Sequence, residues 1–339
     1  MNKPARFVLG CVTVLIGLAW LSAPAHAVRI KLATKAPENF ASSKIIKQMT
    51  EEIAQKTGGQ VTFKIYYGGV KGTGRDLLLK IKSKEIQGGE FTAGEASSVL
   101  SDLRIPSNPL TISSYEELDF VMGRMEPLFQ AELEKAGFVV LGWIEMGFAY
   151  IMSVDPVGSL GDLKGKKVWI PTGDPVGKAA FEAMGVSPTQ YTISDVMVAL
   201  QTGQINTVGN SFVGAIALQW NTKVKFITDR PLLYIYGLTM ITREAWEEIP
   251  AEHRDTVRKL LDQYFGILKA DIRKSNTEAR GTLEKEGIKF VPVSPANYQE
   301  LATVIEKVNK DLAGKEFSGE TMQKMQQFLN EYRTAHPKK

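Results

Sequence analysis

Cysteine and histidine are scarce in this sequence, and their scarcity limits its chemistry. The 339 residues contain one cysteine, Cys11, and three histidines. Beyond the N-terminal stretch only His253 and His336 remain, and neither has a serine or aspartate partner nearby in sequence or a metal-ligand spacing such as H-E-x-x-H. We therefore predict no enzyme activity, no cofactor and no metal site, although a hydrolase that uses only carboxylates stays open.

The apolar segment Phe7–Leu21 is too short for a membrane anchor, because it has 15 residues and a spanning helix needs about 20. Basic residues precede it and Ala25-His26-Ala27 follows it, a pattern typical of a cleavable export signal. We expect residues 1–27 to be removed and a periplasmic chain to begin near Val28. Cys11 would leave with the signal, so packing without disulfides would stabilise the exported chain.

A lipid anchor is the alternative reading of this N-terminal stretch. Val8-Leu9-Gly10-Cys11 resembles a lipoprotein cleavage box, but little apolar sequence precedes Cys11 and the apolar run continues beyond it. The sequence therefore favours a freely soluble mature chain.

The charge of the chain is nearly balanced. Its 41 basic and 37 acidic residues give a net charge of +4, which falls to +2 without residues 1–27. This balance predicts neither a nucleic-acid partner nor a polybasic membrane contact.

Periodicity predicts an α/β fold. Residues 28–34 alternate as a half-buried strand, and the apolar positions between 45 and 53 predict a helix that ends at Gly58-Gly59, where glycine permits a left-handed cap. Residues 61–65 alternate again. A strand, a helix and a strand in this order form a βαβ unit, which predicts a mainly parallel sheet covered by helices.

A second α/β block follows the first. The sequence predicts strands at 139–141 and 167–170 and helices at 175–184 and 194–202, each helix being followed by glycine. No short-period repeat is visible, so we predict two similar domains rather than a solenoid.

The C-terminal third is helical. No proline interrupts Ala251 to Glu286, and apolar residues recur there at helical spacing. Such a helix would be about 54 Å long, longer than one domain, so we expect it to span both. Ser294-Pro295 then predicts the start of another helix, and a last one is expected over 319–334.

Three sequence phrases, in this order, carry a family resemblance. They are Asp162–Trp169 (DLKGKKVW), Phe181–Gly185 (FEAMG) and Ala199–Gly203 (ALQTG), and Ile241–Trp246 precedes the long helix in a similar way. The chain resembles the P subunits of TRAP (tripartite ATP-independent periplasmic) transporters, the DctP-like extracellular solute-binding proteins of family 7. The resemblance covers essentially the whole mature chain.

The resemblance implies two α/β domains joined by crossing strands and a cleft that closes over one small organic solute. Domain I would comprise 28–148 and about 237–275, and domain II would comprise 149–236 and about 276–339 with the C-terminal helices. The implied partners are the small and large TRAP membrane subunits; monomer or homodimer stays open. A solute that contacts both domains stabilises the closed state, which the permease can recognise.

The chain departs from the family at the expected carboxylate clamp. The family's arginine, which meets a carboxylate through two parallel hydrogen bonds, is replaced by Trp169, and Ala149 stands where a second arginine often lies. Asn210 matches an asparagine that usually touches ligand. If Trp169 lines the cleft, an aromatic, hydrophobic or cationic solute would suit it better than a simple dicarboxylate. Trp169→Ala would then weaken binding and leave the fold intact.

Further candidates for the wall of the cleft are aromatic residues near the crossing strand and a carboxylate in the glycine-rich segment 88–95, which we expect to be a turn. Each has a second interpretation, since the aromatics could be core residues and the carboxylate part of a solvated loop. The candidate ligand-binding residues are Trp169, Asn210, Phe148, Trp143, Phe212, Trp220, Tyr150 and Glu95.

Two alternative roles keep a binding-protein fold. A periplasmic accessory or sensor protein would bind a ligand for signalling or efflux, because fold does not fix function. An ABC-type binding protein would predict a neighbouring ATPase gene and would not explain the three phrases. Genes for two TRAP membrane subunits beside this one would favour uptake.

Overall fold

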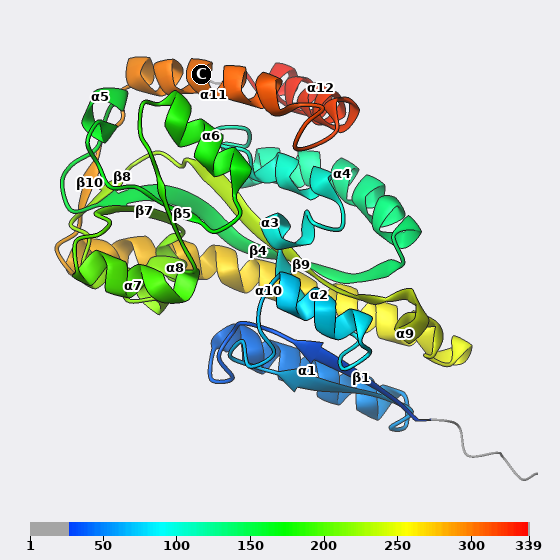
Figure 1. The fold of residues 1–339 in the computed structure, drawn as a ribbon. Coiled ribbons are helices and arrows are strands. Elements are labelled where there is room, and N and C mark those ends of the chain that lie inside the picture. Colours follow the sequence, from blue (N-terminus) through cyan, green and yellow to red (C-terminus); the bar gives the residue numbers. More distant parts are fainter. Residues whose placement is uncertain (1–26, 338–339) are drawn as a thin grey trace, which may run out of the picture.

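A computed structural model describes residues 27–337, and Figure 1 shows its ribbon. The predicted signal peptide and the cleavage box at Cys11 lie outside the described residues, except for residue 27 itself. Within the described part of the chain, no helix is both long and apolar enough to cross a membrane.

Three parallel strands build the sheet of lobe I, our name for the part formed by β1–β3 and the first half of β4. β1 pairs in parallel with β2 on one side and with β3 on the other, and α1 connects β1 to β2 as the βαβ pattern predicts. The elements are β1 (Val28–Ala33), α1 (Ala41–Lys56), β2 (Val61–Tyr66), α2 (Arg75–Lys82), β3 (Gly88–Thr92), α3 (Ala93–Ala96), η1 (Ser101–Ser107) and α4 (Tyr115–Lys135).

The glycine-rich segment 88–95 is not the turn that its composition predicts. It forms β3 and the short helix α3. A Cβ atom on Gly88 would lie 2.1 Å from the carbonyl oxygen of Met240 in the neighbouring strand. Glycine is therefore needed here for close approach of two backbones rather than for a reversal of the chain.

Two long strands cross between the lobes. β4 (Phe138–Ser153) and β9 (Leu233–Thr242) pair antiparallel from Phe138 to Ala149, with register shifts at Val140/Gly142 and Glu145/Gly147. β9 also pairs antiparallel with β3. The sheet is therefore mixed rather than mainly parallel, and these strands are the ones that carry the chain from one lobe to the other.

Lobe II, our name for the part built on the end of β4 with β5–β8 and β10, is a second α/β layer. β4 pairs there with β7 on one edge and with β8 on the other, and β5 and β6 pair in parallel. The elements are α5 (Leu160–Leu163), β5 (Trp169–Pro171), α6 (Pro175–Ala183), β6 (Thr189–Tyr191), α7 (Ile193–Gln201), β7 (Thr207–Asn210), α8 (Phe212–Ala217), η2 (Trp220–Thr222), β8 (Phe226–Thr228) and β10 (Lys289–Val291). The short helix α9 (Arg243–Glu247) follows β9 and belongs to lobe I, where Ala245 packs in one cluster with residues of β1 and α1.

The long helix α10 (Ala251–Lys285) confirms the prediction from its uninterrupted apolar periodicity. Leu261 and Phe265 in its first half pack with α1 and β1, and Ala279 and Leu283 in its second half pack in the core of lobe II. Figure 1 shows α10 running beneath both parts of the sheet. One helix therefore braces both lobes.

The two last helices divide between the lobes. Helix α11 (Pro295–Leu312), capped by Ser294 as predicted, packs on α5 and α6 of lobe II. Helix α12 (Gly319–Ala335) packs instead on α4 of lobe I, although we expected it in the second domain. Asp102 of η1 fixes its start by accepting hydrogen bonds from the backbone of Ser318 and the hydroxyl of Thr321.

Glu126 of α4 gives the fold a dependence on pH. Burial raises the pKa of its carboxyl to about 7, with Lys269 opposing the shift. Because the folded pKa lies above the unfolded value, this group's stabilising contribution is present below about pH 4.5 and is lost as the pH rises towards 7.

We therefore expect Glu126→Gln to raise the free energy of unfolding at pH 8 by about 1–2 kcal/mol, and to change it little at pH 4.5. Urea unfolding of both proteins at the two pH values measures the difference. Glu134→Gln, at an exposed position of the same helix, is the control. An equal effect of Glu126→Gln at both pH values would contradict the assignment.

Candidate functional site

Six strands point their carboxyl ends at the boundary between the lobes. In lobe I β1, β2 and β3 are parallel, and Thr92 at the end of β3 pairs with Gly237, in the part of β9 nearer lobe II. In lobe II β7 ends at Asn210, which pairs with Tyr150, and β5 and β6 run parallel to β7. Open α/β sheets bind ligands outside the carboxyl ends of their strands. The candidate site is therefore the region between these two sets of ends.

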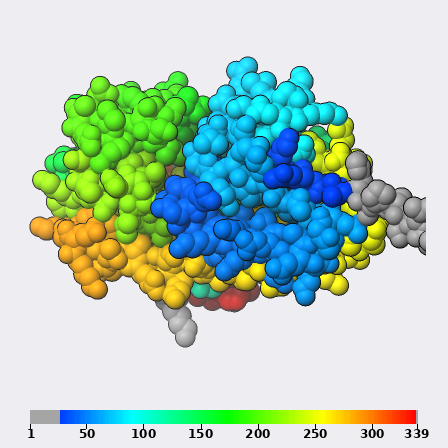
Figure 2. Space-filling model, turned by 90° about the horizontal axis from the view of Figure 1, so that it is seen from below, coloured from blue at the N-terminus to red at the C-terminus, as the bar shows by residue number. Residues whose placement is uncertain are grey.

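Figure 2 shows this boundary from below, where the blue surface of lobe I meets the green surface of lobe II. The surface of α10, yellow to orange, lies along both. The loops that follow β1, β2 and β3 therefore face those that follow β5, β6 and β7.

The lobe I side carries two carboxylates and a lysine. The hydroxyl of Thr34, just after β1, donates to the carboxylate of Glu90 in β3. Lys35 Nζ lies 2.5 Å from Glu95 Oε2, and both side chains are about a quarter exposed, at 23% and 24%. Glu95 also caps α3 by accepting the backbone N–H of Thr92 at 2.8 Å. The Lys35 ammonium has three N–H donors and uses one on Glu95, so the other two can donate hydrogen bonds to an acidic group of a solute.

Trp169 is the first residue of β5 and is buried. Its side chain is 6% exposed, and its Nε1 donates to the carbonyl oxygen of Tyr191 at 3.0 Å. Its ring packs edge-on against Trp220, with 5.2 Å between centroids. In this arrangement both rings offer a solute little surface, and their roles as ligand contacts stay predictions.

Asn210 lies at the end of β7 beside two stacked aromatic rings. Its Oδ1 accepts the backbone N–H of Ser211 at 2.8 Å, and its Nδ2 has no hydrogen-bond partner among the described residues. Tyr150, its partner across the strands, stacks on Phe212 with 4.2 Å between ring centroids. Burial raises the pKa of Tyr150, so its hydroxyl stays a neutral donor at physiological pH. Asn210, Tyr150 and Phe212 thus form one group at the candidate site.

The other two predicted aromatics lie on the α4 side of the crossing strands. Trp143 contacts Phe129 of α4 and Tyr236 of β9. Phe148 contacts Tyr115 and Tyr234. Both belong to the apolar cluster beneath α4, so the structure does not bring them together with the lobe II aromatics. Tyr150 is the predicted residue that packs against both clusters.

Thr34 and Lys35 were not among the candidates that the sequence suggested, whereas the segment with Glu90 and Glu95 was. The signal was nevertheless present, because residues 28–33 and 88–92 are parallel neighbouring strands in one βαβ arrangement. The polar residues at and just beyond their ends therefore had to lie side by side. Reading segment 88–95 as a turn concealed this register.

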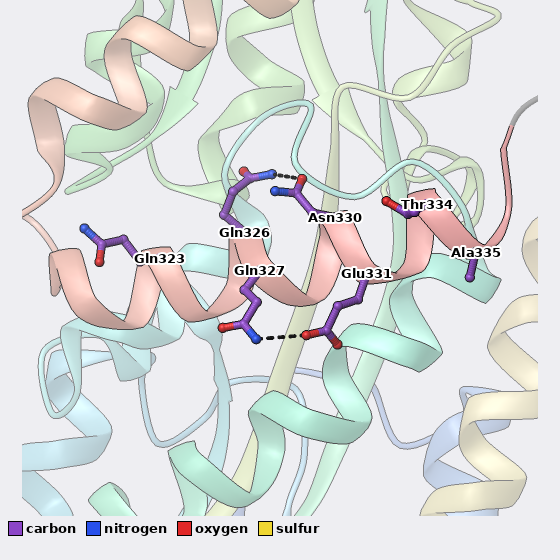
Figure 3. Close-up of a pocket in the computed structure, with 7 residues that line it drawn as sticks. All are labelled: Gln323, Gln326, Gln327, Asn330, Glu331, Thr334 and Ala335. Carbon is purple, nitrogen blue, oxygen red and sulfur yellow. Dashed lines mark hydrogen bonds between the residues drawn. The ribbon is translucent and has the colours of Figure 1, made fainter.

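Two other features do not add to the site. A shallow hollow on α12 is lined only by residues of that helix, namely Gln323, Gln326, Gln327, Asn330, Glu331, Thr334 and Ala335. Figure 3 shows their side chains, with hydrogen bonds from Gln326 to Asn330 and from Gln327 to Glu331. No strand end reaches this hollow. Among residues 27–337 no His, Cys, Asp or Glu residues are grouped so that they could hold a metal ion.

Comparison with known proteins finds similarity over nearly the whole chain. A family model described as bacterial extracellular solute-binding protein, family 7, matches residues 32–316. A solute-binding protein of Roseobacter denitrificans is 24% identical over 309 residues, which are 90% of this chain and 94% of that protein.

Two solved structures share the fold. DctP7 of Bordetella pertussis, an extracytoplasmic solute receptor binding pyroglutamic acid, has a TM-score of 0.81 at 20% identity and covers 90% of this chain and 100% of its own. A TRAP periplasmic solute-binding protein of Chromohalobacter salexigens with bound D-glucuronate has a TM-score of 0.81 at 17% identity, covering 89% and 99%. The two-domain α/β architecture expected from the sequence is thus confirmed.

Proposed function

This chain belongs to bacterial extracellular solute-binding protein family 7, and on that premise we propose that it is a periplasmic receptor. It captures a small organic acid between its lobes and delivers it to the membrane subunits of a TRAP transporter. The observation that carries this proposal is the convergence of six strand carboxyl ends on one boundary, where an amide and a lysine lie on opposite sides.

The chemical class of the solute is inferred from the donors at these ends and from the structural neighbours. The neighbours of known structure named above bind pyroglutamic acid and D-glucuronate, both carboxylic acids. Here Lys35 supplies a cation from lobe I and Asn210 an amide from lobe II, in place of the arginine that Trp169 replaces. The carboxylates of Glu90 and Glu95 would accept hydrogen bonds from hydroxyl or N–H groups of the same solute.

Delivery follows from the two-lobe arrangement. A solute held by groups of both lobes stabilises only the arrangement in which the lobes are close, so binding shifts the population towards it. A permease that contacts both lobes would distinguish the loaded receptor from the empty one.

The first test is a thermal-shift screen of the protein comprising residues 28–339 against organic acids, sugar acids, neutral polyols and organic cations. We expect one class of acid to stabilise it, by about 2.7 kcal/mol at a hundred times the dissociation constant. Asn210→Ala should weaken binding of that acid about tenfold, because a hydrogen bond to a buried charged group is lost.

Asn330→Ala, on the outer face of α12, is the matched control and should bind as the wild type does. Equal affinities of the two variants would place the solute elsewhere. No stabilisation by any class would oppose the receptor function and favour the accessory role. Uptake of the solute by cells in which the genes for the TRAP membrane subunits are deleted would contradict the TRAP assignment.

A further inference from the structure

An arginine of lobe I reaches across the boundary to lobe II. Arg104 in η1 places its Nη1 3.7 Å from Asp174 Oδ1, and its Nη2 donates to the carbonyl oxygen of Gly173 at 3.4 Å. The side chains of Arg104 and Asp174 are 16% and 29% exposed. This contact joins η1 of lobe I to the loop after β5 of lobe II.

The lobe II partner of Arg104 is part of the candidate site. Gly173 and Asp174 lie in the loop that follows the carboxyl end of β5, four and five residues beyond Trp169. Asp174 also caps α6, because its Oδ1 accepts the backbone N–H of Gly177 at 3.0 Å. The position of this loop therefore sets the start of α6 as well as one wall of the site.

A second contact at the same place is apolar. Val176 in the first turn of α6 is buried in the cluster that contains Leu103 and Ile105, the neighbours of Arg104 in η1. The start of α6 is thus held against lobe I by an ion pair, a hydrogen bond from Arg104 to a backbone carbonyl and a buried valine side chain. Separation of the lobes would break all three.

We infer that Arg104 is a positioning residue that ties the loop after β5 to lobe I and so favours the closed arrangement, without itself contacting the solute. This inference rests on the proposed function, in that closure retains a solute. The action of Arg104 on the lobes themselves requires no solute.

The geometry sets the size of the effect. Both polar contacts are long and partly exposed, and such pairs contribute little individually. That suits a contact that must open in each cycle of capture and release. We expect Arg104→Ala to lower the ratio of closed to open empty protein about two- to fivefold, and to speed solute release by a similar factor. High salt should produce part of the same change in the wild type.

The experiment measures the distance between the lobes in the empty protein. Residues 28–339 contain no cysteine, so Lys82→Cys in lobe I and Gln201→Cys in lobe II, both exposed, accept a pair of spin labels cleanly. We expect Arg104→Ala and Asp174→Asn to move the distance distribution towards longer values. Asparagine still caps α6, so Asp174→Asn tests the charge separately from the cap.

Arg75→Ala, at an exposed arginine of α2, is the matched control, and Arg104→Lys should restore part of the closed population. Unchanged distance distributions in Arg104→Ala and Asp174→Asn would overturn the inference even if a solute were found. If the distance distribution shifts but the thermal-shift screen finds no solute, the inference stands and the proposed function is unsupported. The melting temperature of Arg104→Ala should change little. A purely structural role of Arg104 would instead lower the melting temperature and leave the distances between the lobes unchanged.

Discussion

Replacing Trp169 with alanine is expected to lower the free energy of unfolding by about 3–5 kcal/mol, the range for removing a buried large aromatic side chain. The ring fills the space beside Trp220 and is 6% exposed. Alanine would leave a cavity there and would leave the carbonyl oxygen of Tyr191 without its indole donor. This differs from the expectation drawn from sequence alone, in which the variant keeps its fold.

Trp169→Phe decides whether the ring also contacts the solute. It retains most of the volume and loses the indole N–H, so we expect a loss of about 1–1.5 kcal/mol. Urea unfolding of both variants measures stability, and titration of Trp169→Phe with the solute measures affinity. Unchanged affinity would make Trp169 a core residue, whereas a tenfold loss would make it a ligand contact. A stability loss below about 1 kcal/mol in Trp169→Ala would contradict the burial.

The scaffold was predictable where one local pattern decides the structure. Apolar periodicity over 251–286 predicted α10 to within one residue, because no other element can bury a stripe at that spacing. Ser294-Pro295 was predicted to start a helix, and the side chain of Ser294 accepts the expected backbone N–H group there. These features depend on neighbours within four residues, so the sequence contains all the information they need.

The site was less predictable because it depends on contacts between distant segments. Asn210 lies at a strand end facing lobe I and its contact with a ligand stays a prediction, whereas the burial of Trp169 depends on Trp220 and Tyr191. An aromatic residue has the same local pattern in a core and in a binding wall. Likewise the apolar stripe of α12 does not by itself name the lobe on which it packs, because that depends on the distant residues that contact Met325 and Leu329 and on Asp102, which binds the start of the helix.

The second large effect is expected at Arg273, which joins α10 to β4 and α4. Its guanidinium makes two hydrogen bonds of 2.7 Å with Glu145 and two, of 2.7 and 2.8 Å, with Asp119. The side chain of Glu145 is 8% exposed, so Arg273→Ala would leave a buried carboxylate without its bidentate partner. We expect a loss of about 3 kcal/mol in the free energy of unfolding at pH 7.

The pH dependence of this loss distinguishes an ion pair from simple packing. The hydrogen bond from Arg273 is the main cause that holds the pKa of Asp119 below its usual value. A depressed folded pKa contributes stability that is present above the unfolded pKa, near 3.8, and is lost as the pH falls through the folded pKa. The difference between wild type and Arg273→Ala should therefore be largest near pH 7 and should shrink as the pH falls below 4.

Lys274→Ala, which removes an exposed cation from the adjacent position of α10, should cost less than about 0.5 kcal/mol at any pH. A deficit of Arg273→Ala that stays constant from pH 7 to pH 3 would mean that the arginine stabilises the fold through packing on Tyr115 of α4 rather than through its ion pairs.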